Sequence, residues 1–446
     1  MRDNFKSSFG VLVAMAGSAI GLGNLWRFPY LMGTNGGAAF IIIYLVLVFL
    51  LCLPIMMSEF VVGRRSQVNA VRAFKVLHPK GRWGLVGVLG VLASVALIAF
   101  YCVVGGWTID YLVHSVSFSL PEQGASEGFF AAAVSSPWRT LAYTWVFLLL
   151  TALVLLAGIK DGIERYTKIM MPLLFLTIIV IAVRSVTLPG AGAGLEFLFR
   201  PDFSKVTANT FLDALGQAFF SLSIGCATIL TYGSYVKKHE KIVKLSSLTA
   251  VSDTFFAILA GLAIMPAVFA FGISPSEGPG LLFVVLPDIF DQMAGGGVIS
   301  ILFFFVLFIA AITSSISLLE VSVTFLIEEC RLRRRTAVLL SSLVCLVLCS
   351  LCALSGGVLS DIRILGRTFF DFFDMISANF LMPLCGLLVV VFVGWKMKRT
   401  AFVDELSNGG TLPNRRLYDI IFYMVRYVAP IVIAVIMIFG WLQALK

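Results

Sequence analysis

A run of unusual residues interrupts the first long apolar segment of the chain, and it reads Gly17-Ser-Ala-Ile-Gly-Leu-Gly-Asn-Leu-Trp-Arg-Phe-Pro29. A glycine inside a helix costs about 1 kcal/mol relative to alanine, and a charged arginine at mid-bilayer costs roughly 2.5–3.5 kcal/mol. Backbone leaves the helix at membrane depth only where protein buries it or where it lines a wet cavity. Freed carbonyl oxygens suit Na⁺, and the N-termini of half-helices suit a carboxylate. The run therefore predicts an ion or substrate site in a helix that is broken at mid-membrane.

A second interrupted helix is expected in the sixth apolar segment, where Ser221, Ser223, Gly225 and Thr228 lie near its middle. If the first ten apolar segments form two sets of five, the first and sixth segments occupy corresponding positions. Because five is odd, the two sets have inverted topology. Paired discontinuous helices in inverted repeats indicate the binding site of a secondary transporter.

Two other apolar segments carry isolated side chains whose oxygen atoms could bind an ion. Thr313 and Ser314 are adjacent hydroxyls, and such hydroxyls by themselves most often bond to carbonyls of their own helix. Asp253 is an acid in an apolar segment, where a buried carboxylate needs a cation partner or a proton.

The elements that must position these residues are membrane helices. Of the 446 residues, 59% are hydrophobic and 13% are charged, which is typical of a polytopic helical membrane protein and excludes a small soluble one. Eleven membrane-spanning helices are expected, at about 9–33, 38–61, 84–116, 138–157, 166–187, 210–236, 246–273, 296–327, 336–354, 368–395 and 419–442.

The chain is expected to be a single transporter domain over 1–446. The first five-helix repeat covers about 1–187, the second, inverted repeat about 188–400, and an extra C-terminal helix about 417–446. Residues 400–416 are expected to be a flexible linker.

The net charge of +9 is distributed in alternate loops, as in Arg64-Arg65, Lys237–Lys244 and Arg331–Arg335. This pattern indicates a multi-pass protein of the cell's inner (plasma) membrane with a cytoplasmic N-terminus, and eleven spans place Lys446 outside. Because the charges follow the loops, they do not favour nucleic-acid binding.

Nothing in the chain resembles an enzyme site. The eight Cys lie mostly inside apolar segments without a His nearby, so a metal cluster is not expected. The sequence has neither a nucleophile–base arrangement nor a Gly-rich phosphate loop with its Lys. We therefore expect no enzyme activity and no organic cofactor.

With these motifs the sequence resembles the neurotransmitter:sodium symporter family, in particular its bacterial amino-acid transporters. The run over 17–29 is the most specific match, and Asn35-Gly-Gly-Ala-Ala-Phe40, Gln217-Ala-Phe-Phe-Ser-Leu-Ser223 and Thr313-Ser-Ser-Ile316 support it. The resemblance implies an all-α integral membrane fold with a 5+5 inverted repeat and broken helices 1 and 6.

The resemblance also implies two sodium sites built from oxygen atoms. One would use the carbonyls of Gly17, Ile20 and Ala310 with the side chains of Thr313 and Ser314. The other would use Ala19, Asn24, Ser221, Asp253 and the carboxylate of the substrate.

The implied substrate pocket lies between the two broken helices. Tyr101 would bond the substrate carboxylate, and Phe220 would be an aromatic lid. The side-chain pocket has no acid or base, which favours a neutral hydrophobic amino acid, aliphatic or aromatic. The substrate-binding residues would be Ala19, Gly23, Leu97, Tyr101, Phe220, Ser221, Ser223, Cys226, Ser314 and Leu318.

Charged pairs would gate this pocket. Arg27 would pair with Asp374 on the outside, and Arg2 with Glu328 on the inside, where Tyr235 would assist. Exposed ion pairs stabilise by only about 0–1 kcal/mol, which suits gates that form and break.

Asp253 departs from the family, in which this sodium-site position is commonly Asn. Chloride-dependent relatives bind Cl⁻ close by, among positions that match Tyr44, Gln217, Ser221 and Ala257, and Ala257 lacks their hydroxyl. We hypothesise that Asp253 supplies the fixed negative charge, which would make transport chloride-independent.

The expected function is sodium-coupled import of neutral hydrophobic L-amino acids by alternating access, in a monomer or weak dimer within the lipid bilayer. Proton coupling at Asp253 or Glu320 stays open as an alternative, as do a channel and an amino-acid receptor with the same fold.

Overall fold

The computed structural model describes residue 5, residues 7–273 and residues 282–444. Within these ranges the regular secondary structure is helical, apart from one isolated bridge between Ile364 and Arg367. The α-helices are α1 (Ser8–Ala19), α2 (Phe28–Thr34), α3 (Ala38–Leu47), α4 (Leu53–Ser66), α5 (Ala70–Leu77), α6 (Gly84–Val116), α7 (Ser126–Ser135), α8 (Pro137–Leu156), α9 (Arg165–Val186), α10 (Gly192–Phe199), α11 (Ala208–Ser221), α12 (Thr228–Gly233), α13 (Ile242–Ala270), α14 (Val285–Gln292), α15 (Gly296–Glu329), α16 (Arg334–Leu354), α17 (Phe369–Met375), α18 (Met382–Trp395), α19 (Arg399–Leu406), α20 (Arg415–Tyr423) and α21 (Ala429–Ala444). Short π-helical segments at Gly23–Arg27, Val48–Cys52, Ile159–Glu164, Ile376–Leu381 and Met424–Val428 join some of them.

The membrane-helix architecture is confirmed. In the described ranges, nine helical stretches are long and apolar enough to cross a bilayer, and the pair Ser8–Ala19 and Gly23–Thr34, bent by 47°, makes a tenth. The sixth predicted segment is divided into α11 and α12, each too short to span alone. The total of eleven membrane-spanning helices stays a prediction.

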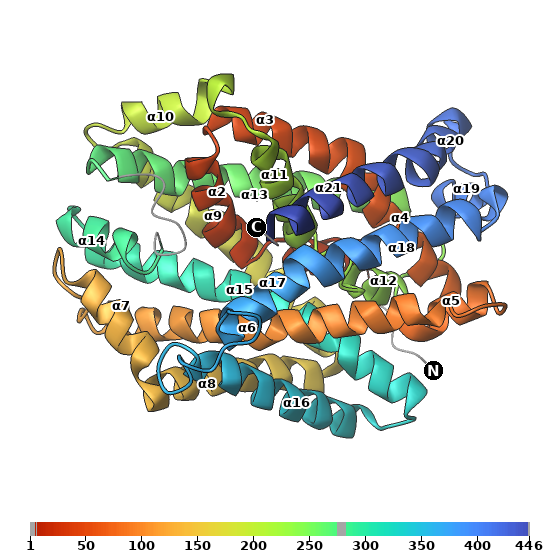
Figure 1. The fold of residues 1–446 in the computed structure, drawn as a ribbon, viewed down its shortest axis with the longest axis horizontal. Coiled ribbons are helices and arrows are strands. Elements are labelled where there is room, and N and C mark those ends of the chain that lie inside the picture. Colours follow the sequence, from red (N-terminus) through yellow and green to blue (C-terminus); the bar gives the residue numbers. More distant parts are fainter. Residues whose placement is uncertain (1–4, 6, 274–281, 445–446) are drawn as a thin grey trace.

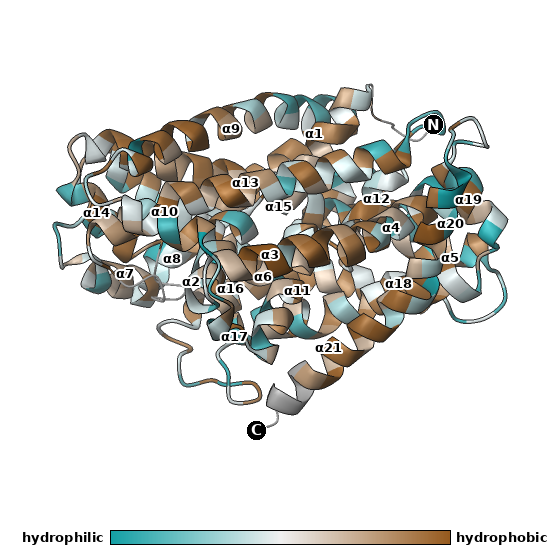
Figure 2. Cartoon of the chain, turned by 90° about the horizontal axis from the view of Figure 1, so that it is seen from above, coloured by the Kyte–Doolittle hydropathy of each residue, from teal (hydrophilic) through white to brown (hydrophobic). Residues whose placement is uncertain are grey.

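The long helices run side by side, and the two broken ones lie among them (Figure 1). Apolar residues cover the middle of the bundle, and polar residues gather at its two ends (Figure 2). We call the end with α5, α19 and α20 the inner end and the end with α7, α10 and α14 the outer end, following the orientation expected from the loop charges.

The break in the sixth segment requires rare backbone conformations. Ser223, Gly225 and Ala227 have φ angles of 53°, 83° and 59°, in the left-handed region. Such a conformation costs a non-glycine residue about 1–3 kcal/mol and persists only where the surroundings fix it. One fixing contact comes from α4, where Oε1 of the buried Glu59 accepts a hydrogen bond from the Gly225 N–H at 2.7 Å.

The inner half-helix α12 lies directly on α4. A Cβ atom on Gly63 would be only 2.0 Å from the carbonyl oxygen of Leu230, and one on Gly233 would be 3.1 Å from the carbonyl oxygen of Phe60. The two backbones therefore touch without intervening side chains.

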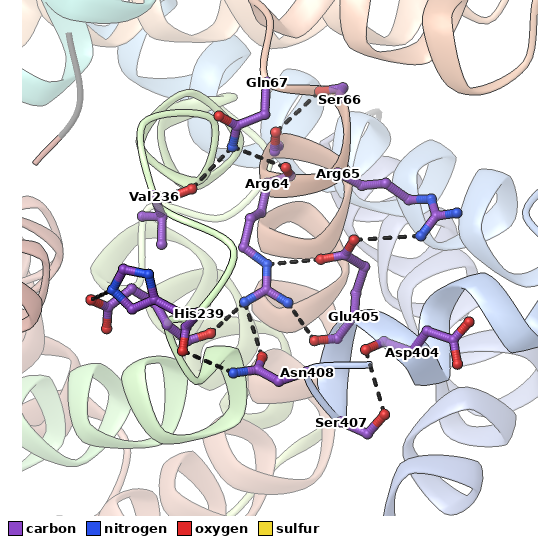
Figure 3. Close-up of polar contacts among 12 residues, drawn as sticks. Arg64, Arg65, Ser66, Gln67, Val236, His239, Asp404, Glu405, Ser407 and Asn408 are labelled. Atoms are coloured by element: carbon purple, nitrogen blue, oxygen red, sulfur yellow. Dashed lines mark hydrogen bonds and ion pairs between the residues drawn. The ribbon is translucent and has the colours of Figure 1, made fainter. Parts of the chain in front are cut away.

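A buried arginine joins α4 to α19 at the inner end (Figure 3). Arg64 is 1% exposed, and its Nε donates to Oε2 of Glu405 at 2.8 Å. Its guanidinium also donates to Oδ1 of Asn408 at 3.2 Å and to the backbone carbonyls of Glu405 and Glu240. The prediction of a flexible linker over 400–416 is therefore wrong for the residues of α19, which form a helix fixed by Arg64.

Replacing Arg64 with methionine should destabilise the protein strongly, because it leaves the Glu405 carboxylate largely buried without its main partner. Breaking a buried ion pair from one side costs about 3–5 kcal/mol. The neighbouring Arg65 provides a matched control, since it contacts the same carboxylate at 3.4 Å but is 38% exposed. Thermal unfolding in detergent should show a much larger drop in Tm for Arg64→Met than for Arg65→Met. Equal drops would mean that burial of Arg64 is unimportant.

Candidate functional site

A small cavity lies where the two helix breaks meet. The structure places every predicted substrate-binding residue in its wall except Ser221. The lining residues are Ser18, Ala19, Gly21, Gly23, Leu97, Tyr101, Phe220, Ser223, Cys226, Ser314, Leu318 and Met382.

Sequence reasoning missed three of these residues. Ser18 and Gly21 belong to the run over 17–29, so attention to its whole length would have found them. Met382 lies in an apolar segment without any polar neighbour that would mark it, and only the packing of α18 brings it to the cavity.

The break in the first helix is in close contact with its surroundings. Tyr101 Oη accepts a hydrogen bond from the Leu22 N–H at 3.1 Å. A Cβ on Gly21 would be 2.4 Å from Ser314 Oγ, and one on Gly23 would be 2.7 Å from the Phe220 ring. Side chains at these two glycines would therefore enter space that the site residues already occupy.

One cluster of oxygen atoms lies between the first break and α15. Ser314 Oγ lies 3.4 Å from the carbonyl oxygen of Gly17, 3.3 Å from that of Ser18 and 3.4 Å from that of Ile20. Thr313 Oγ1 donates to the carbonyl oxygen of Ala310 at 3.1 Å.

Ser314 Oγ thus lies beside the Gly17 and Ile20 carbonyls predicted for the same sodium site, while the other two predicted donors, Thr313 Oγ1 and the Ala310 carbonyl, bond to each other within α15. A sodium site built from these five donors stays a prediction. They are neutral oxygen ligands, which a hard monovalent cation accepts. The Ser314 hydroxyl can turn its proton away and present a lone pair to an ion.

A second cluster surrounds Asp253, whose side chain is fully buried. Ser221 Oγ lies 2.8 and 2.9 Å from its two carboxylate oxygens, and Tyr44 donates to Oδ2 at 3.3 Å. Asn24 Nδ2 donates to Oδ1 of Asp253 at 2.8 Å and to Ser221 Oγ at 3.0 Å. The structure therefore brings Asn24, Ser221 and Asp253 together, as the sequence predicts.

The charge of Asp253 is not matched by a cation. Within the described ranges, no Lys, Arg or His forms an ion pair with it, and its hydrogen bonds come from neutral groups. Removing an uncompensated charge from water is costly. A cation bound here would offset that cost.

The resemblance also implies that Ala19, Gln217 and Ala257 lie at or near this cluster. Ala19 lines the adjoining cavity. Gln217 Nε2 donates to the Gly23 carbonyl at 2.8 Å, while its buried Oε1 has no hydrogen-bond partner in the described chain. The Ala257 side chain is buried and offers no hydroxyl.

At the outer end, Arg27 does not form an ion pair with Asp374, although the two are within electrostatic range. Its guanidinium lies over the ring of Phe220, 5.4 Å from the centroid. Nη1 of Arg27 is buried and lacks a hydrogen-bond partner among the residues described. A cation–π contact thus joins the two predicted outer elements, the gate arginine and the aromatic lid.

The inner gate is only partly described, because Arg2 lies outside the described residues. Glu328 accepts hydrogen bonds from the backbone and side chain of Asn69 at 2.6 and 3.1 Å. Tyr235 donates to Oε1 of Glu320 at 2.7 Å.

Glu320 itself has a cation partner. Arg334 Nη2 lies 2.7 Å from Oε2 of the fully buried Glu320, and Arg334 Nη1 lies 3.1 Å from Oε1. The Arg334 Nε donates to the Leu155 carbonyl at 2.8 Å. The Glu320 carboxylate is therefore charge-compensated by Arg334.

Comparison with known proteins agrees with this geometry. A family model described as the sodium:neurotransmitter symporter family matches residues 2–139 and 132–445. The chain is 40% identical over 434 residues to YhdH, an uncharacterized sodium-dependent transporter of Bacillus subtilis, covering 97% of this chain and 96% of that protein. It is 28% identical over 411 residues to the sodium-dependent serotonin transporter of Drosophila melanogaster, covering 80% of this chain and 65% of that protein.

Among solved structures, the fold is similar to that of MhsT crystallised in complex with L-phenylalanine. The TM-score is 0.92 at 39% sequence identity, over 98% of this chain and 99% of MhsT. The fold, the extent of these matches and the broken helices together show that this chain is a sodium-dependent transporter, not an enzyme, and belongs to the sodium:neurotransmitter symporter family.

Proposed function

We propose that this protein imports neutral hydrophobic L-amino acids, aliphatic or aromatic, by alternating access, together with two sodium ions and independently of chloride. The observation that carries the proposal is the cavity between the two helix breaks. Ser314 of the first cluster lines it, and Asn24 and Ser221 of the second cluster each directly follow a lining residue, Gly23 and Phe220. The similar protein MhsT was crystallised with L-phenylalanine, which supports an amino acid as the substrate.

The composition of the cavity wall supports a zwitterion with an apolar side chain. Tyr101 and the break in the first helix offer polar groups for a carboxylate and an ammonium group. Leu97, Leu318 and Met382 are apolar, and the lining residues include no acid or base. A charged substrate side chain would be left unpaired there, which costs several kcal/mol.

Sodium coupling provides enough free energy to accumulate such a substrate. Each Na⁺ that enters gains about 2.3 kcal/mol per 100 mV of membrane potential. Two ions gain roughly 4.6 kcal/mol with a zwitterion that has no net charge, about three decades of accumulation. Coupling to the membrane potential requires a protein that spans the plasma membrane. We place its N-terminus in the cytoplasm and its C-terminus outside.

Proton coupling is the second candidate, and it now rests on Asp253 alone, since Glu320 pairs with Arg334. The test is uptake of labelled Trp and Leu into proteoliposomes, with and without Na⁺, in competition with each of the twenty amino acids. We expect saturable, sodium-dependent uptake that hydrophobic amino acids inhibit. Sodium-independent uptake would favour proton coupling, ion current without substrate would indicate a channel, and binding without counterflow would indicate a receptor.

A further inference from the structure

Met382 is the one methionine in the wall of the central cavity, and it occupies a special place in its helix. It is the first residue of α18 and directly follows the π-helical segment Ile376–Leu381, with Pro383 after it. A π-helical turn contains an extra residue, which re-aims the side chains that follow, and such turns are frequent at functional sites. The Met382 side chain is 1% exposed.

The main chain of Met382 packs directly against the break in the sixth segment. A Cβ on Gly225 would be 2.1 Å from the Met382 carbonyl oxygen and 2.9 Å from its Cα. Glu59 fixes Gly225 through the hydrogen bond to its N–H. The backbone at Met382 therefore has no room to move towards the break, and the side chain is the part that adapts most easily, by rotation about its torsions.

The other apolar side chains of the wall are less adaptable. Leu97 and Leu318 are branched and have two side-chain torsions each. The Cys226 thiol contacts the Ser223 carbonyl and the Thr228 hydroxyl, both at 3.2 Å. A methionine is unbranched, has three side-chain torsions and a polarizable sulfur, and fills irregular space at low cost.

We propose that Met382 is a specificity-determining residue that sets which apolar side chains the cavity accepts. Its thioether swings aside for an aromatic ring, whose edge it then contacts through sulfur, and lies across the cavity against a smaller aliphatic chain. This inference rests on the proposed amino-acid transport and adds a molecular cause for a broad preference among hydrophobic substrates.

The test compares Met382→Leu, Met382→Ala and Met382→Phe with wild type in inhibition of uptake by Ala, Leu, Phe and Trp. One methylene in an apolar pocket changes discrimination by about 10–200-fold. We expect Met382→Ala to shift the Trp-to-Leu affinity ratio at least about tenfold towards Trp, and Met382→Phe to shift it towards the smaller substrates. Met382→Leu, with similar volume but a stiffer chain, should weaken binding of Trp and Phe and leave Leu unchanged.

Met397→Ala is the matched control, because Met397 follows α18 at the inner end and does not line the cavity. The Met397→Ala variant should show the same order of preference among Ala, Leu, Phe and Trp as the wild-type protein. If wild type takes up amino acids and all three Met382 variants keep its order of preference, the inference is overturned while the proposed function stands. If wild type takes up no amino acid, the proposed function fails and the inference fails with it.

Discussion

Replacing Asp253 with alanine should lower sodium-dependent uptake by at least about a hundredfold. The carboxylate is fully buried, and its hydrogen-bond partners Asn24, Ser221 and Tyr44 are neutral. Two opposite charges 4 Å apart attract by about 4 kcal/mol at an effective dielectric constant of 20, which corresponds to nearly three decades in binding. An alanine removes this attraction and one or two oxygen ligands together. The measurement is initial uptake of labelled Leu as a function of sodium concentration.

The variant Asp253→Asn separates charge from shape. It keeps the size and one oxygen atom but removes the negative charge that contacts Tyr44 and Ser221. We expect wild-type uptake to be unchanged when gluconate replaces chloride, and the uptake that remains in Asp253→Asn to require chloride. Asp202→Asn, at an exposed acid, serves as the control for loss of one charge. Strict chloride dependence of the wild-type protein would refute the hypothesis that Asp253 supplies the fixed charge.

Replacing Ser314 with alanine should raise the sodium concentration for half-maximal uptake by about 10–100-fold. The hydroxyl faces the carbonyl oxygens of Gly17, Ser18 and Ile20, where it would complete the ligand set of an ion. Interactions between a polar group and a charge contribute about 1.5–3 kcal/mol, which gives this range. Uptake at saturating sodium should be affected much less than uptake at low sodium.

The adjacent Ser315 gives a matched control for this substitution. Its hydroxyl is also buried in α15, but it bonds to Thr151 at 2.8 Å and to the Ile312 carbonyl at 3.0 Å. Ser315→Ala removes the same atom from the same helix on a face away from the cluster. If both variants have the same sodium dependence, Ser314 is a structural hydroxyl and not a sodium ligand.

The sequence predicts the broken helices well because their cause is local. Glycines, Asn24 and Arg27 cannot lie in lipid as part of a regular helix, so the place of the first break follows from residue types and membrane depth. The lengths of the apolar segments likewise indicate the long membrane helices, which the structure contains. The convergence of Asn24, Ser221 and Asp253 needed the family resemblance in addition, because these residues come from three different segments.

Other features depend on contacts between distant parts of the chain and have no local signal. The residues of α19 precede Gly409, Gly410 and Pro413, which favour a loop, and only the contact with Arg64 shows what holds the helix in place. Met382 reaches the cavity through the packing of α18, which follows a π-helical segment that the sequence does not mark. The position of Arg27 over Phe220 likewise depends on how two broken helices meet.

The contact between α4 and α12 has a mechanical consequence. Where Gly63 meets Leu230, not even a methyl group fits between the backbones, so the contact has no slack with which to absorb a displacement. The contact is rigid, so a displacement of the short half-helix α12 must also displace α4. From there it reaches Arg64 and the exposed rim of the bundle at α19. A spectroscopic label on α19 would therefore serve as an external pointer to the position of a half-helix that is itself buried.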